Sequence, residues 1–147
     1  MEDKKYFSRQ IDESLMAWKN STRHKPLLLR GARQVGKSSS VRHLAKQFDN
    51  FVEINFERKP AYLEIFKGDR DAKHIVEMIK SITGEPIVPG KTLLFFDEIL
   101  MCQEAISSLR FFWEDMPGLH VIAAGSLLEF ALSEIPTFGV GRIHSMF

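Results

Sequence analysis

The segment LLLRGARQVGKSSS, residues 27 to 40, constrains the fold most strongly, because an apolar run, a glycine-bounded loop and a helix-like start follow one another directly. Its central part, from Gly31 to Ser38, matches the pattern GxxxxGK[ST] at every fixed position. The glycines of this pattern let backbone N–H groups converge on a phosphate, the lysine reaches the outer phosphate oxygens, and the hydroxyl is a ligand for Mg²⁺. The segment therefore predicts a strand, a phosphate-binding loop and a helix in succession.

The phosphate-binding loop defines most of the expected nucleotide contacts. Lys37 is expected to contact the β and γ phosphates and to take part in catalysis, and Ser38 is expected to bind Mg²⁺. The alternative is a glycine turn followed by a solvent-facing lysine. The residues expected to contact the nucleotide are Gly31, Ala32, Arg33, Gln34, Val35, Gly36, Lys37, Ser38 and Ser39.

A second motif supplies two carboxylates. The apolar run TLLFF, residues 92 to 96, is followed directly by Asp97 and Glu98. Asp97 is expected to hold Mg²⁺ through its water shell, and Glu98 to polarise the water that attacks the γ-phosphate. A phosphotransferase acting on a small molecule needs no second carboxylate here, so the pair favours ATP hydrolysis. The alternative is a solvated acidic pair that caps the next helix.

The order of apolar segments indicates the fold class. Helical spacing of apolar residues predicts helices around residues 7–18, 41–48, 75–82, 106–113 and 127–132. Short apolar runs predict strands at 26–29, 51–56, 92–96 and 119–124, and a further strand begins near the end of the chain. This alternation predicts an α/β fold with a largely parallel sheet covered by helices. We expect an N-terminal helix and linker over 1–24 and a core over 25–147, truncated before any lid or C-terminal domain.

Composition narrows the function classes. The chain has 147 residues, with 20 Lys and Arg against 19 Asp and Glu, so its overall charge does not indicate a nucleic-acid partner. No apolar run approaches the ~20 residues of a membrane span, and the N-terminus lacks the apolar core of a signal peptide. We therefore expect a cytoplasmic protein without membrane contact. The five histidines are dispersed in sequence, which does not indicate a zinc site.

Two polar residues lie at other expected strand ends. Ser126 follows the HVIAAG segment and is expected to contact the attacking water or the γ-phosphate, or else to form the turn and cap the next helix. Asn55 ends the EIN segment, where its amide is expected to hydrogen-bond Glu98 and hold it away from water, or else simply to form a turn.

Taken together, these blocks resemble the AAA-type branch of phosphate-loop ATPases, and specifically the prokaryotic AAA domain family fourteen. The resemblance rests on PLLLRGARQVGKS, FVEINFE, KTLLFFDEI, SSLRFFWED, HVIAAGSLLEFAL and GVGRI. It implies a three-layer core with a mostly parallel sheet of order 5-1-4-3-2, the last strand incomplete. It also implies ATP binding and Mg²⁺-dependent hydrolysis, with the roles described above for Lys37, Ser38, Asp97 and Glu98 and with Ser126 at the sensor position.

The resemblance leaves the source of a catalytic cation open. In AAA-type enzymes a cationic side chain from a neighbouring subunit or a lid usually stabilises the transferring phosphoryl group. Arg142 is a candidate in cis or in trans, the alternative being a surface arginine in a salt bridge, and Arg33 is equally ambiguous. We expect hydrolysis, weak in this chain, to be coupled to C-terminal domains, with a homo-oligomer or a protein partner binding through that region. The alternative function is a nucleotide-gated interaction module with little turnover.

Overall fold

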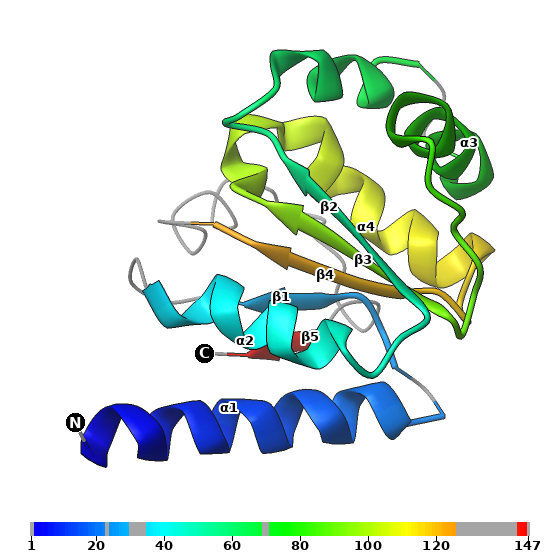
Figure 1. Cartoon of the computed structure of the whole chain (residues 1–147). Coiled ribbons are helices and arrows are strands. Elements are labelled where there is room, and N and C mark those ends of the chain that lie inside the picture. Colours follow the sequence, from blue (N-terminus) through cyan, green and yellow to red (C-terminus); the bar gives the residue numbers. More distant parts are fainter. Residues whose placement is uncertain (1, 23, 30–34, 69–70, 126–143, 147) are drawn as a thin grey trace.

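The computed structural model describes residues 2–22, 24–29, 35–68, 71–125 and 144–146 (Figure 1). The described residues form a parallel sheet with helices on both of its faces. This confirms the prediction of an α/β fold built around a parallel, helix-covered sheet.

The five described strands lie in the order β2-β3-β4-β1-β5. Their bounds are β1 Leu27–Leu29, β2 Asn50–Asn55, β3 Thr92–Asp97, β4 His120–Ala124 and β5 His144–Met146. The first four strands therefore follow the order 1-4-3-2, and β5 pairs with the other edge of β1. Because β4 alone separates β1 from β3, the strand before the phosphate-binding loop lies close to the strand that carries the two carboxylates.

The helices divide between the two faces of the sheet. Helices α1 (Glu2–Asn20) and α2 (Val35–Ala45) cover one face, and α3 (Ala72–Thr83) and α4 (Gln103–Asp115) cover the other (Figure 1). Two short 3₁₀ helices, η1 (Pro60–Phe66) and η2 (Ile99–Met101), lie in connections. The periodicity of the sequence does not predict η1 and η2, because three to seven residues are too few for a helical period to show.

Strand alternation produces two apolar layers. Phe95 of β3 packs with α1 and α2, whereas its neighbour Phe96 packs with α3 and α4. All six residues of β3 are buried, which explains why this strand reads as a continuous apolar run ending in Asp97. The burial of β3 therefore fixes the Asp97 carboxylate at the carboxyl end of this strand.

A cluster of rings joins the C-terminal end of α1 to the sheet. His24 and His120 stack with ring centroids 3.6 Å apart and planes 15° apart, and Trp18 contacts both rings edge-on. The Nε2 atom of His120 lies 3.0 Å from the carbonyl oxygen of Lys19, whereas the Nδ1 atoms of both histidines are buried without a partner. Two of the five histidines, which are dispersed in sequence, are thus paired in space.

We expect acid to destabilise the fold through this pair. Burial and the nearby His120 lower the pKa of His24 from 6.5 to about 4. Burial lowers the pKa of His120, whereas its contact with the Lys19 carbonyl raises this pKa in part. A histidine whose pKa is lowered by folding stabilises the folded state above its unfolded pKa, and this contribution is lost as the pH falls from about 6.5 toward 4. The melting temperature should therefore fall between pH 7 and pH 5, and less steeply in His24→Phe.

A matched control separates this pair from the general titration of the chain. His74 is exposed on α3, so His74→Gln should keep the slope of the parent. Burial raises the pKa of Asp97 and Glu98, so their protonation favours the folded state and acts in the opposite direction. Equal slopes of melting temperature against pH in the parent and in His24→Phe would contradict the assignment.

Candidate functional site

The two predicted metal ligands meet at the carboxyl edge of the sheet. Ser38 lies in the first turn of α2, and Asp97 is the last residue of β3. The Ser38 hydroxyl donates a hydrogen bond of 3.3 Å to Asp97 Oδ2, although 59 positions separate the two residues. The carboxyl edge of a parallel sheet is where α/β proteins bind their ligands, so this contact places both motifs at one site.

Asp97 provides a buried negative charge at this edge. Its side chain accepts a second hydrogen bond, at 2.9 Å, from the backbone N–H of Glu98 to Oδ1. Burial raises the pKa of Asp97, whereas the hydrogen bonds from Glu98 and Ser38 lower it. A nearby cation strongly stabilises the charged form of a buried carboxylate. A hydroxyl oxygen and a carboxylate oxygen together are suitable ligands for Mg²⁺.

The donor set fits a magnesium ion held partly by its substrate. Among the residues that the structure describes, no group of three or more His, Cys, Asp or Glu side chains could hold a metal by itself. Mg²⁺ usually keeps several waters and is bound through one or two protein oxygens together with substrate phosphates. Ser38 and Asp97 match this arrangement better than an all-protein metal cage.

Glu98 has an unusual backbone conformation. Its φ of 54° and ψ of 46° lie in the left-handed region, and it is the one non-glycine residue with positive φ in the described part of the chain. Such strain is concentrated at functional sites, where it directs a side chain away from the regular alternation of a strand. Burial, and then the neighbouring charges of Asp97 and Glu57, raise the pKa of the half-buried Glu98.

The helix-capping interpretation of the acidic pair does not describe the structure. The helix α4 begins at Gln103, with Cys102 at its N-cap position, whereas Glu98 precedes only the short η2 and makes no side-chain cap bond there. Gly125, after β4, lies against this turn, and a Cβ atom built on it would be 3.4 Å from the backbone nitrogen of Ile99. The end of β4 therefore packs directly against the turn that carries Glu98.

The start of α2 lies at the same edge as Asp97. The backbone of Val35, Gly36 and Lys37 forms the first turn of α2, which contains no acidic residue. The free N–H groups at such a helix end favour an anion. Ser39, next in sequence to the half-buried Ser38, is exposed. The other predicted site residues lie outside the described part of the chain: Gly31, Ala32, Arg33, Gln34, Ser126 and Arg142.

Asn55 forms a turn rather than the expected bond to Glu98. Its Oδ1 accepts hydrogen bonds from the backbone N–H groups of Glu57, at 3.0 Å, and Arg58, at 3.2 Å. No hydrogen bond joins the Asn55 side chain to Glu98 among the described residues. Asn55 is nevertheless the register partner of Asp97, so it lies beside the acidic motif.

Two residues near the site were missed by the sequence analysis. Arg42 on α2 and Glu53 on β2 form a salt bridge of 3.1 Å, and both influence the pKa of Asp97. The spacing of four residues between Ser38 and Arg42 was the available signal, since it places both on one side of a helix. The partner of Arg42 was not predictable without knowing how α2 lies on the sheet.

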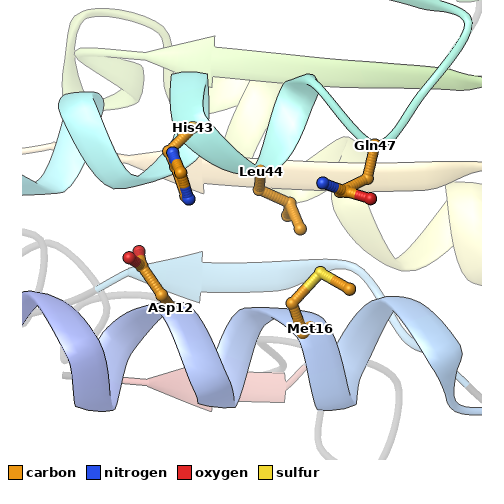
Figure 2. Close-up of a pocket in the computed structure, with 5 residues that line it drawn as sticks. All are labelled: Asp12, Met16, His43, Leu44 and Gln47. Atoms are coloured by element: carbon orange, nitrogen blue, oxygen red, sulfur yellow. The ribbon is translucent and has the colours of Figure 1, made fainter.

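A groove between α1 and α2 is separate from this edge. Figure 2 shows Asp12 and Met16 of α1 facing His43 and Leu44 of α2 and Gln47 of the turn after it. The space between them has a volume of about 160 Å³. Pockets for drug-sized ligands are usually about 300–1,000 Å³. The groove contains no predicted site residue and is smaller than a nucleotide site. In addition, no helix in the described ranges is long and apolar enough to cross a membrane.

The chain was compared with known proteins and protein families. A family model described as an AAA domain, number fourteen of its series, matches residues 23–147. No curated protein matches the chain. The family match begins after α1 and includes the phosphate-binding loop, β3 and the acidic pair. The family is one of nucleotide-binding, ATPase-type domains, which agrees with the edge described above. The chain therefore belongs to the AAA domain family fourteen, as its sequence motifs predict.

Proposed function

We propose that the chain binds ATP together with Mg²⁺ at the carboxyl edge of the sheet and hydrolyses the ATP. The observation that carries this proposal is the hydrogen bond between Ser38 and Asp97, which joins the two motifs at 3.3 Å. The left-handed backbone of Glu98 immediately after Asp97 supports a specialised role for this carboxylate. Membership of the AAA domain family supports ATP as the nucleotide.

Each motif then has a distinct task. The loop from Gly31 to Gly36 and the first turn of α2 hold the phosphates, and Lys37 neutralises the β and γ oxygens. Ser38 would hold Mg²⁺ directly and Asp97 would hold it through water, and the ion would offset the charge on the phosphate oxygens. Glu98 accepts a proton from water as the water oxygen attacks the γ-phosphorus. The bond from this phosphorus to the bridging oxygen breaks, so ADP and phosphate leave.

Three further residues complete the proposal. Ser126 would orient the attacking water, and Arg142 would stabilise the transferring phosphoryl group in cis or from a neighbouring copy. Asn55 would regulate Glu98 by donating a hydrogen bond from its side-chain N–H to the carboxylate. In AAA-type proteins the energy of hydrolysis drives conformational change, which here would act on C-terminal domains or on a bound partner.

A nucleotide-gated switch with little turnover is the second candidate. The observation that favours it is that the cation Arg42, near Asp97, is held by both oxygens of Glu53. A cation engaged in this way does not stabilise a transferring phosphoryl group. A catalytic cation that does so contributes about 10³- to 10⁵-fold in rate. Nucleotide-dependent binding of a partner without phosphate release would support the switch.

Phosphate release from ATP by the full chain, with Mg²⁺ or with EDTA, tests the proposed function. We expect release with Mg²⁺ and none with EDTA. Ser38→Ala and Asp97→Asn should each raise the half-saturating Mg²⁺ concentration by at least about tenfold, since they remove groups that hold the ion. Ser107→Ala, on the far helix α4, is the matched control and should behave as the parent. Phosphate release by the parent in EDTA at the rate seen with Mg²⁺, or an unchanged Mg²⁺ requirement in Ser38→Ala and Asp97→Asn, would contradict the proposal.

A further inference from the structure

A bidentate ion pair joins α2, the helix that follows the predicted phosphate-binding loop, to β2, the edge strand of the sheet. Arg42 Nη2 donates to Glu53 Oε2 at 3.1 Å, and Arg42 Nε donates to Glu53 Oε1 at 3.2 Å. Two parallel bonds between a guanidinium and a carboxylate fix orientation as well as distance. The contact therefore restricts how α2 is turned about its own axis.

The ion pair lies near both predicted metal ligands, Ser38 and Asp97. Arg42 follows Ser38 by four residues, so the two side chains leave α2 on the same side. Glu53 precedes Asn55 by two residues on β2, so both side chains point to the α2 face of the sheet, and Asn55 is the register partner of Asp97. Any rotation of α2 that broke the ion pair would also move Ser38 relative to Asp97.

Apolar packing alone does not define this rotation. The buried side of α2 contacts the sheet through Val41 and Leu44, whose contacts are non-directional. On its other side α2 packs against α1 in the same apolar cluster, and the small space shown in Figure 2 remains between the two helices. The contact between Arg42 and Glu53 adds a directional constraint on the side of Ser38.

We propose that Arg42 and Glu53 are positioning residues, which hold Ser38 in the orientation that lets it share one Mg²⁺ ion with Asp97. This inference rests on the proposed Mg²⁺ and ATP site. The pair itself touches neither the nucleotide nor the ion. It acts through the rotation of α2, so its loss weakens Mg²⁺ binding even though the two ligands are unchanged.

A simple charge effect predicts a different pattern. If the pair acted only through space, loss of the Arg42 cation would strengthen Mg²⁺ binding and loss of the Glu53 anion would weaken it. If the pair acts by positioning, Arg42→Gln and Glu53→Gln weaken binding alike. The double variant is then no weaker than either single variant, because the same contact is lost in all three.

The test is a Mg²⁺ titration of the full chain with a fluorescent ATP analogue as the probe. We expect Arg42→Gln, Glu53→Gln and the double variant each to raise the half-saturating Mg²⁺ concentration about tenfold. This is the lower end of the range of losses seen when a group that orients a metal ligand is removed. The exchanged pair Arg42→Glu with Glu53→Arg should recover most of the parent affinity. Opposite shifts in the two single variants, or no shift in either, would overturn the inference.

Controls separate this result from instability and from failure of the proposed function. Glu77→Gln breaks a comparably exposed salt bridge to Lys80 on the distant helix α3 and should leave the titration unchanged. Exposed pairs contribute little to stability, so the melting temperatures should agree within about 5 °C. If Ser38→Ala and Asp97→Asn also leave the Mg²⁺ requirement unchanged, the proposed site is wrong. If they raise it and the pair variants do not, only the positioning role is wrong.

Discussion

Replacing Glu98 with glutamine is expected to lower kcat for ATP hydrolysis by about 10²- to 10⁴-fold, the usual contribution of a general base. Glutamine keeps the size and hydrogen-bonding reach of the side chain but does not accept the proton of the attacking water. The affinity for ATP should remain within about threefold of the parent, because Glu98 does not contact the phosphates in the proposed site. Single-turnover phosphate release and equilibrium ATP binding measure the two quantities separately.

Glu57→Gln is the matched control for this change. Glu57 is an exposed carboxylate that raises the pKa of Glu98, so its neutralisation leaves the base in place. We expect the control to keep turnover close to the parent. A Glu98→Gln chain that hydrolyses ATP at the parent rate, or that loses ATP binding, would show that Glu98 is not the base.

Replacing Lys37 with alanine should weaken nucleotide binding severely. Removal of one partner from a desolvated charge pair costs about 2–5 kcal/mol, which corresponds to a loss of affinity of about 30-fold or more. The loss should be larger for ATP than for ADP, because the ammonium group is expected to reach the γ-phosphate as well as the β-phosphate. Isothermal titration of both nucleotides with the variant measures this difference.

Lys46→Ala provides the control on the same segment. Lys46 is exposed just after the end of α2, at Ala45, so it carries the same charge at the opposite end of the helix. Its removal should leave both affinities close to those of the parent. Equal losses in Lys37→Ala and Lys46→Ala would indicate a general effect of charge rather than a specific contact with phosphate.

The sheet and its motifs were predictable from sequence because burial and spacing are local properties. The buried run before Asp97 reads as a strand for the same reason that it packs between two layers of helices. The GxxxxGKS pattern likewise locates the start of α2 within a residue or two, since the loop and helix serve one purpose. The meeting of Ser38 and Asp97 followed from the parallel sheet.

Contacts between distant segments were not predictable in the same way. The stack of His24 on His120 depends on how the linker after α1 lies against β4. The spacing of apolar residues in the sequence does not predict this placement. The ion pair of Arg42 with Glu53 depends on the rotation of α2 over β2. Asn55 was assigned a bond to Glu98 from its place at a strand end, whereas in the structure its Oδ1 accepts hydrogen bonds from the backbone N–H groups of its own turn.

A crystal structure of the chain with Mg²⁺ and a non-hydrolysable ATP analogue tests the central claim most directly. The account predicts the phosphates at the N-terminus of α2, with Mg²⁺ about 2.1 Å from Ser38 Oγ and Asp97 bound to a water of the same ion. It also predicts a water between Glu98 and the γ-phosphorus. A nucleotide bound elsewhere, or a phosphate-bound Mg²⁺ that contacts neither Ser38 nor the water shell of Asp97, would contradict the account.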